Sequence, residues 1–581
     1  MIRVALLALI FLATWVDADT SGDFARLIED FEAHELANDP IRAGRRGDLE
    51  AAARWPDPGP EAVRLRREAE DGFRQRLAAM AADELDEDER ISHLVMAHVL
   101  DTRAGMAGFD AQRVGFTNDS GFFSLPVQVA GATRARSVAE AEAWLARLAA
   151  IPEYFLAHQA WLEQGIESGF VQPRLVVERV IEQLESVLSI PADEHPLLGP
   201  LQQLPAHVES GQREQLLRAG RSTVVESALP AYRDLLAFFR ERYLAEPRSS
   251  IGISEVPDGR EFYRQLVRHH TTLDTTPEEI HQLGLKEVER IRSEMTEVIA
   301  DTGFEGDFAA FLAYLRSDPR FYADSAEELL MHAAWIAKRA DDAMPRFFRH
   351  LPRLPYGVRP VPDSIAPNYT TGRYWAGDLE AGIAGGYMVN TYRLDQRPLY
   401  ELPALTLHEA VPGHHHQIAI AQELENVPDF RRNTYITAFG EGWALYTEWL
   451  GVEMGIYRTP YEHFGRLTFE MWRACRLVVD TGIHYFGWSR EQAEACLLEN
   501  SALAPHNVRT EIERYISWPG QALAYKTGEL LIRELRSEAE EALGADFDLR
   551  AFHDHLLAVG AIPLEALRTR MENWITQQQQ I

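Results

Sequence analysis

The amino-acid sequence predicts a mainly α-helical protein with one small β-sheet. From Ser21 to about Glu246, apolar residues recur at spacings of three and four in segments rich in the helix formers alanine, leucine, glutamate and arginine. Between Arg353 and Tyr400 the chain is rich in glycine, proline, tyrosine and threonine. After Pro403 the helical pattern returns and continues to the end. The sheet is therefore expected just before a second helical region.

The first residues read as an export signal. Arg3 precedes an apolar run that ends near Trp15, and a small-x-small cleavage site ends at Ala18. The run is too short to span a membrane, so residues 1–18 are expected to be a signal peptide. No other segment has ~18 consecutive apolar residues. The sequence thus predicts a periplasmic or secreted protein without stable membrane insertion.

The rest of the chain divides loosely near residue 250. Residues 19–250 are expected to form an N-terminal helical region, punctuated by breakers such as Trp55–Pro60. Residues 251–581 contain the small sheet and the motifs described below. Within the sheet region, Tyr356–Val361 and Gly386–Tyr392 have the composition and alternation of short strands.

Charge and cysteine content narrow the classes of function. The net charge of −31 disfavours a nucleic-acid-binding surface, which needs a basic stripe, and docking on anionic lipids. The two cysteines, Cys475 and Cys496, form neither a CxxC pair nor a disulfide framework. They are expected to form one disulfide in an oxidising compartment or to remain as two free thiols.

The segment ALTLHEAVPGHHHQIAIAQEL, residues 404–424, has the clearest chemistry. A His-Glu pair, His408 and Glu409, is expected to open an apolar helix there. In the HExxH motif, two histidines four residues apart bind one zinc ion, and the adjacent glutamate acts as general base. In this chain Pro412 stands where the second histidine is expected.

Two alternatives remain for the second histidine ligand. On a straight helix, His414 faces about 240° from His408, whereas His415 faces the same way but lies ~10 Å further along the axis. Either would need a distorted helix, and Pro412 with Gly413 predicts a bulge. We favour His414, because related peptidases close HExGH and HExxGH motifs with a Gly-His step. His415 is the alternative.

A third ligand is expected in AFGEGWALYTEWLGVEMG, residues 438–455. GEGWALYTE resembles the NEGFAxxxE segment of the leucyl-type aminopeptidases, gluzincins whose first glutamate in this segment is a metal ligand. Glu441 matches that position, and Glu448, on roughly the same helix face, is a candidate for orienting a ligand. Two histidines, one glutamate and an open position form a catalytic zinc arrangement, so one Zn²⁺ per chain is expected.

Further candidates surround these motifs. Zinc peptidases need a donor for the oxyanion, and helical relatives place a tyrosine at a comparable distance beyond the glutamate ligand. Tyr525 is our choice for that role, and Tyr515 is the next candidate and a possible substrate contact. Tyr387 and Asn390 are expected to contact substrate, because an edge strand in this place binds extended substrate in many gluzincins. His484 is better explained as a core histidine.

Several blocks together resemble one known family. HEAVPGHHHQ, GEGWALYTEWLG, DTGIHYFGWS, RYISWPGQALAYKTG and GYMVNTY are similar to the signature blocks of the bacterial domain of unknown function 885. That family is grouped with zincin peptidases by its similarity to helical carboxypeptidases and oligopeptidases. The resemblance covers the mature chain. It implies a large multi-helical zincin-like body, a deep substrate cleft and short peptides as substrates.

The sequence therefore favours a zinc metallopeptidase of the gluzincin type, a carboxypeptidase or an oligopeptidase, with Glu409 as general base. One alternative is a zinc-dependent amide hydrolase acting on cell-wall peptides or acylated amino acids. Another is a periplasmic peptide- or metal-binding protein without turnover. A serine hydrolase or a nucleotide-binding protein is not supported, because the sequence has neither a GxSxG elbow nor a GxxxxGK[ST] loop.

Overall fold

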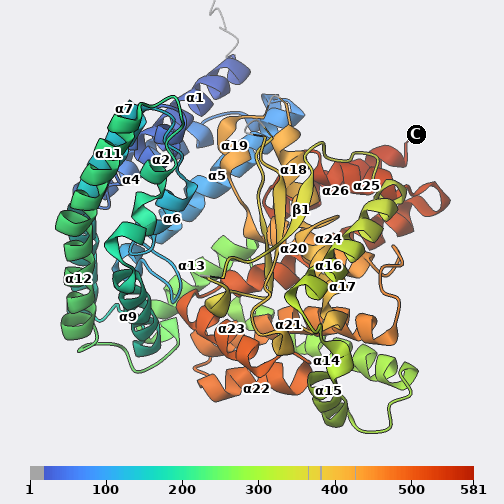
Figure 1. The fold of residues 1–581 in the computed structure, drawn as a ribbon. Coiled ribbons are helices and arrows are strands. Elements are labelled where there is room, and N and C mark those ends of the chain that lie inside the picture. The colour runs from blue at the N-terminus through green and yellow to red at the C-terminus, as the bar shows by residue number, and fades with distance from the viewer. Residues whose placement is uncertain (1–18, 364, 380–381, 426, 581) are drawn as a thin grey trace, which may run out of the picture.

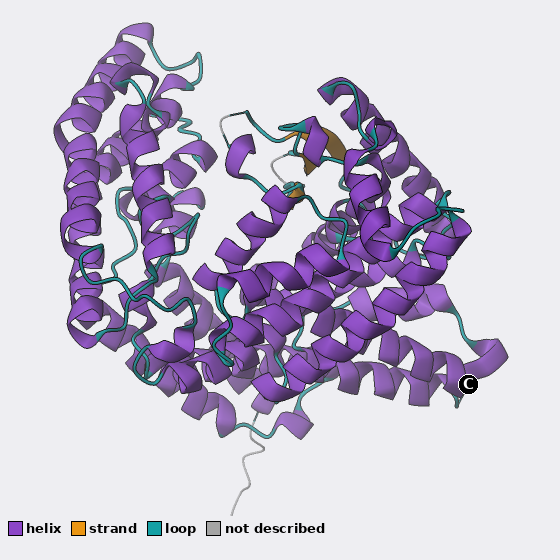
Figure 2. Cartoon of the chain, turned by 90° about the horizontal axis from the view of Figure 1, so that it is seen from below, coloured by secondary structure: helices purple, strands orange, loops and turns teal. Residues whose placement is uncertain are grey.

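The computed structural model describes residues 19–580 except 364, 380–381 and 426, so the expected signal peptide lies outside the described residues. The chain is mainly helical with one small sheet, as predicted. Figure 1 shows the N-terminal helices on one side and the later helices gathered around the sheet on the other. Seen from below, helices make up most of the molecule and the strands form one small patch (Figure 2).

The N-terminal part is built from helices that pack on one another. Their apolar residues recur on one face, as in α9, where Val176, Val180 and Leu184 are fully buried. The helices are α1 Thr20–Asn38, α2 Pro40–Arg45, α3 Leu49–Ala52, α4 Pro60–Ala78, α5 Glu87–Ala107, α6 Leu125–Ala132, α7 Val138–Ala149, α8 Ile151–Ser168, α9 Arg174–Ser189, α10 Gly199–Gln202, α11 Ser210–Thr223 and α12 Leu229–Ala237.

Four helices and the sheet follow. The helices are α13 Gly259–Thr271, α14 Pro277–Asp301, α15 Phe308–Ser317 and α16 Ala326–Ala343, and the strands are β1 Tyr356–Pro360, β2 Gly372–Trp375 and β3 Gly385–Val389. The strand order is β1-β3-β2. β3 runs parallel to β1, with Val358 opposite Tyr387, and antiparallel to β2, with Tyr374 opposite Tyr387. The prediction missed β2 and located the other two strands.

The remaining helices contain the motifs. They are α17 Leu402–Glu409, α18 His414–Glu423, α19 Asp429–Asn433, α20 Thr437–Leu450, α21 Pro460–His484, α22 Arg490–Asn500, α23 Pro505–Ser517, α24 Ala524–Leu543, α25 Leu549–Leu557 and α26 Leu564–Gln578. α21 is buried along most of its length and packs along α14, while α24 packs along α20. α21 and α24 therefore form the interior on which the site is built.

One hydrophobic cluster runs through both parts of the chain, from Phe24 in α1 to Ile575 in α26. The predicted division near residue 250 falls between α12 and α13. The close approach of α20 and α24 depends on Gly528, where a Cβ would lie 2.0 Å from the carbonyl oxygen of Ala438. A larger residue at this position would separate the two helices.

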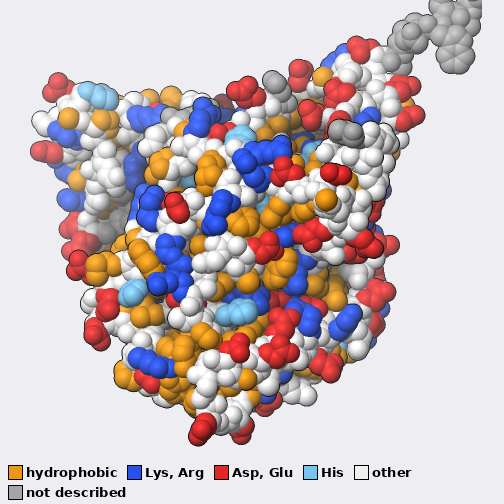
Figure 3. All heavy atoms as spheres, turned by 90° about the vertical axis from the view of Figure 1, so that its right-hand side faces the viewer, with side chains coloured by type: hydrophobic (Ala, Val, Ile, Leu, Met, Phe, Trp, Pro, Cys, Tyr) orange, Lys and Arg blue, Asp and Glu red, His pale blue; other side chains and the backbone are white. Residues whose placement is uncertain are grey.

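Cys475 in α21 and Cys496 in α22 are free thiols whose sulfur atoms lie 2.9 Å apart. The surface seen in Figure 3 carries acidic and basic side chains side by side, with apolar side chains between them. Within the described ranges, no helix is both long enough and apolar enough to span a bilayer.

Candidate metal centre

The His-Glu pair ends a helix instead of opening one. α17 stops at Glu409 and α18 begins at His414, so the expected bulge within one continuous helix is wrong. Ala410 and Gly413 leave the helical conformation, with ψ angles of −116° and −131°. Pro412 between them has no N–H for the helical ladder. Its carbonyl instead accepts a 2.8 Å hydrogen bond from Nε1 of Trp443 in α20, which anchors the break.

Gly413 allows the chain to fold back onto α17. A Cβ at this position would lie 2.0 Å from the carbonyl oxygen of His408 and 2.3 Å from that of Leu407. Any side chain would therefore collide with rigid backbone. With glycine in place, His414 comes next to His408, and their ring centroids are 4.8 Å apart with the planes at 89°.

Three donor atoms converge where α17, α18 and α20 meet. Nε2 of His408 lies 3.4 Å from Oε2 of Glu441, and Nε2 of His414 lies 3.3 Å from the same oxygen. Two atoms that bind one zinc ion at a tetrahedral angle lie roughly 3.4 Å apart. Oε2 of Glu441 is buried and has no hydrogen-bond donor among the described residues. The spacing and the free oxygen fit a zinc ion.

Charge interactions tie this cluster together. Burial lowers the pKa of His408, but Glu441 and Glu448 outweigh it and raise the pKa to about 9. Burial raises the pKa of Glu441, but His414 and His408 outweigh it and hold the pKa well below its ordinary value. A proton on His408 therefore offsets the carboxylates, and a divalent cation bound at the same atoms would replace that proton.

Glu448, a candidate for orienting a ligand, contacts the first histidine. Its Oε1 lies 2.8 Å from Nδ1 of His408 and 3.3 Å from Nη2 of Arg473 in α21. Glu448 is almost completely buried. An imidazole whose Nδ1 donates to a carboxylate presents Nε2 as the free donor atom, which is the usual support of a metal-binding histidine.

The other two histidines of the run point elsewhere. Nδ1 of His415 lies 3.0 Å from the hydroxyl of Tyr374, and the His415 ring packs on Tyr356 of β1. His416 is fully buried, and its ring lies 4.6 Å from that of Phe348. Only His414 of the three joins His408 and Glu441, so the geometry favours His414 over His415.

The sheet holds Glu409. Oε2 of Glu409 accepts a 2.7 Å hydrogen bond from the backbone N–H of Tyr374 in β2. The expectation that residues 385–392 form the free edge is wrong, because β3 pairs with β1 on one side and β2 on the other. The edge beside Glu409 belongs to β2. This strand has four residues, too few for a clear alternating pattern in the sequence.

Tyr387 and Asn390 support the sheet region. Tyr387 is fully buried, with its hydroxyl 3.2 Å from Thr406 Oγ1 in α17. The side-chain amide of Asn390, also buried, donates to the carbonyl oxygens of Ala366, Tyr369 and Thr370. These contacts brace the strands beneath the site and leave little of either side chain for a substrate.

Tyr525 reaches the candidate centre and Tyr515 does not. The ring of Tyr525 is stacked with that of His408, at a centroid distance of 6.4 Å. The Tyr515 hydroxyl instead accepts hydrogen bonds from Trp472 Nε1 and Arg476 Nε inside the protein. His484 is a core histidine, as predicted, because both ring nitrogens have backbone partners, the Ile253 N–H and the Tyr515 carbonyl.

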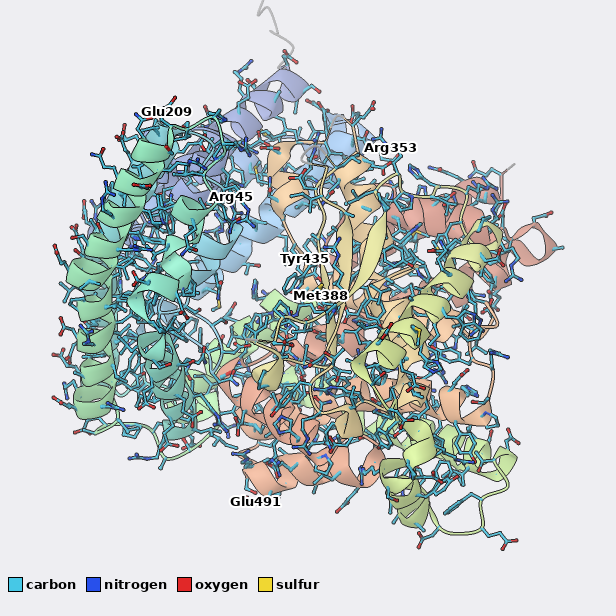
Figure 4. The ribbon with its side chains drawn as sticks, in the orientation of Figure 1. Arg45, Glu209, Arg353, Met388, Tyr435 and Glu491 are labelled. Atoms are coloured by element: carbon cyan, nitrogen blue, oxygen red, sulfur yellow. The ribbon has the colours of Figure 1, made fainter. Side chains whose placement is uncertain are left out.

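Sequence reasoning missed Tyr435, in the loop before α20. A Cβ at Gly440, the residue before Glu441, would lie 2.5 Å from the Tyr435 hydroxyl. Tyr435 as a whole is half-exposed, but desolvation around its hydroxyl raises its pKa, and the charges of Glu441 and Glu409 raise it further. Tyr435, labelled in Figure 4, also lines a cavity of about 260 Å³ together with residues of the N-terminal helices. It belongs to no motif, and its sequence signal is only its closeness to Glu441.

A second group of possible ligands, His34, Glu35 and Glu70, lies in the N-terminal part. Arg103 already pairs with both carboxylates, at 2.7 Å and 2.9 Å. Because an internal cation satisfies these acids, the group around Glu441 is the better candidate for a metal.

The comparisons with known proteins agree on the fold. A family model described as "Bacterial protein of unknown function (DUF885)" matches residues 40–571. The crystal structure of a lipoprotein candidate from Colwellia psychrerythraea is similar over 96% of this chain and 99% of that chain, with 28% identity and a TM-score of 0.87. A lipoprotein candidate of unknown function from Shewanella oneidensis shares the fold over 94% and 99% of the two chains, with 19% identity and a TM-score of 0.72. No curated protein matches the chain.

Proposed function

The chain belongs to the bacterial family of unknown function DUF885, and for this member we propose zinc-dependent hydrolysis of peptide bonds in short peptides. One observation carries the proposal. His408, His414 and Glu441 present three donor atoms at the spacing of a zinc site, and Glu409 follows His408 directly in the chain. A purely structural zinc site would instead be closed by a fourth protein ligand.

The three candidate ligands leave one coordination position of zinc open for water or substrate. His408, His414 and Glu441 would hold one zinc ion, with a fourth position open. When bound, zinc supplies Lewis-acid chemistry that polarises a carbonyl group and activates water. Glu448 keeps the His408 imidazole oriented through its Nδ1.

The remaining roles fall to residues around the ligands. Glu409 acts as general base: it takes a proton from the attacking water and passes it to the leaving amine. The Tyr374 N–H fixes one oxygen of this carboxylate. The hydroxyl of Tyr525, stacked on His408, stabilises the oxyanion, and Tyr435 is a second donor candidate.

The substrate class follows from the sheet edge. The outer edge of β2 lies beside Glu409, and an extended peptide adds to such an edge by backbone hydrogen bonds. The similarity to a lipoprotein candidate supports a place outside the cytoplasm. We propose export with removal of the leader near Ala18, and short periplasmic or extracellular peptides as substrates.

Metal analysis combined with turnover tests the proposal. Zinc should be present at one ion per chain in the wild type and in Glu409→Gln, and should be lost in His414→Ala and Glu441→Ala. His415→Ala is the matched control, because His415 adjoins His414 but bonds to Tyr374. Hydrolysis of a short-peptide library should fall at least about a hundredfold in Glu409→Gln.

The outcomes test the metal ligands and the hydrolytic reaction separately. Equal zinc in the wild type and Glu441→Ala would refute the ligand set. Full activity in Glu409→Gln would refute the role of the general base. Zinc at full occupancy without hydrolysis of any peptide would point to a binding protein instead.

A further inference from the structure

Three arginine side chains surround Tyr525. The guanidinium carbon of Arg476 lies 4.2 Å from the centre of the Tyr525 ring, and that of Arg473 lies 6.0 Å from it. Nη2 of Arg514 lies 3.5 Å from the Tyr525 hydroxyl. Three cations from α21 and α23 thus surround one tyrosine that is stacked on His408.

The acids that form ion pairs with these cations are shared among them. Glu511 pairs with both Arg476 and Arg514, at 2.9 Å and 3.2 Å. Glu448 pairs with Arg473 but also lies 2.8 Å from His408. In these ion pairs three guanidinium groups share two carboxylates, and the nearby carboxylate of Asp480 already accepts hydrogen bonds from the Tyr263 hydroxyl and the Gly520 N–H. Nη1 of Arg476 is buried without a hydrogen-bond acceptor in the described part of the chain.

Arg373 adds a fourth cation at the sheet edge. It precedes Tyr374, whose N–H holds Glu409, and its guanidinium carbon lies 5.4 Å from the ring centre of Tyr369. Arg373 is exposed and forms no ion pair with any described residue. Although its side chain is exposed, desolvation of the guanidinium by nearby protein lowers the pKa of Arg373, and the charges of Tyr369, Tyr525 and Glu409 outweigh that effect.

Arg514 and Tyr525 lie close to the candidate metal centre. Arg514 Nη2 is 3.5 Å from the Tyr525 hydroxyl, and the Tyr525 ring is 6.4 Å from the His408 ring. We propose that Arg373 and Arg514 bind the free α-carboxylate of a peptide, so that the site cleaves close to the C-terminus. This inference rests on the proposed function.

The charges near the site also disfavour recognition of the N-terminus of a peptide. A site that reads a free N-terminus needs acidic groups for the ammonium, and here Glu441 and Glu409 already have other roles. A carboxylate is the planar anion that a guanidinium binds best, with two parallel hydrogen bonds. In the reaction, the C–N bond breaks, water supplies OH to the acyl carbon, and its proton goes to the amine through Glu409.

A carboxylate can come from the chain end or from an acidic side chain, and three peptides separate the two sources. They share one sequence and end in a free acid, in an amide, or in an amide that follows an added aspartate. Binding is measured with the zinc-loaded Glu409→Gln protein by the anisotropy of a fluorescent label at the peptide N-terminus. Turnover of the same peptides is measured with the wild type by mass spectrometry.

Arg373→Gln is the test variant, Arg373→Lys keeps the charge, and Arg359→Gln on the far strand β1 is the matched control. The free acid should bind at least about tenfold more tightly than the amide. That preference should vanish with Arg373→Gln, be partly kept with Arg373→Lys, and be unchanged with Arg359→Gln. Products of the wild type should be single residues or very short C-terminal fragments.

Three results would overturn the inference. Equal binding and turnover of acid and amide would refute the carboxylate anchor while leaving peptide hydrolysis intact. Preference for the aspartate-containing amide over the free acid would assign the arginines to an acidic side chain. If the zinc-loaded protein neither bound nor cleaved any peptide, the proposed function would fail together with this inference.

Discussion

Glu448 and Glu401 show how differently two buried carboxyl groups can be used near one site. Glu448 is paired with His408 and Arg473 and serves to orient a ligand. Glu401, just before α17, is also buried, but its Oε1 has no hydrogen-bond partner within the described chain. Burial raises the pKa of Glu401 to about 8, although Arg397 and Arg316 act to lower it.

Glu401 therefore predicts a loss of stability as the pH rises. Its pKa is higher in the folded state than its ordinary value of 4.5. The protonated carboxyl therefore contributes its full stabilising free energy below pH 4.5, and this stability is lost as the pH rises through 8. Between these pH values the free energy of unfolding falls by up to roughly 1.4 kcal/mol for each pH unit. In melting experiments from pH 5 to 9, Glu401→Gln should decline less than the wild type. The exposed control Glu499→Gln should follow the wild type. Parallel curves for all three would contradict the assignment.

At the scale of elements, local sequence patterns predict the helices. The order of the strands and the residues gathered at the site depend on long-range contacts that these patterns do not contain. The spacing of apolar residues is a property of each helix, so the helical regions and two strands could be predicted. The order β1-β3-β2 depends on pairing between distant segments, so the sequence alone predicts β3 as an edge strand although it is the central one. His408, Glu409 and Glu441 could be located because motifs carry them. Tyr435 and Arg373 could not, because only the folded chain brings them to the site.

The turn between α17 and α18 should be required for zinc binding. Gly413→Ala places a Cβ against the His408 carbonyl oxygen, so the turn must open and His414 must move away from His408. We expect zinc binding to be lost and the free energy of unfolding to fall by roughly 1–3 kcal/mol or more. Gly72→Ala in α4, where a Cβ meets nothing within 4 Å, is the control and should be neutral or stabilising. Full zinc content in Gly413→Ala, measured by plasma mass spectrometry, would show that the turn is not needed.

At the scale of the molecule, a buried charge network joins the helices behind the site. Nζ of Lys526 in α24 is fully buried and lies 2.8 Å from Glu470 of α21, 3.2 Å from Glu287 of α14 and 2.8 Å from Glu529. Lys526 follows Tyr525 directly. The network therefore fixes the start of α24, and with it the position of the tyrosine beside His408.

Removal of this cation should destabilise the whole protein. Lys526→Met keeps much of the side-chain volume but leaves three buried carboxylates short of one partner, and the loss of one member of a buried ion pair costs about 3–5 kcal/mol. The midpoint of guanidinium unfolding, followed by tryptophan fluorescence, should drop accordingly. Lys338→Met is the matched control, because its ion pair with Asp341 is exposed and should contribute less than about 1 kcal/mol. If both variants unfolded at the same denaturant concentration, Arg290, Arg466 and Arg533 would be sufficient to balance the acids, and the network would not depend on Lys526.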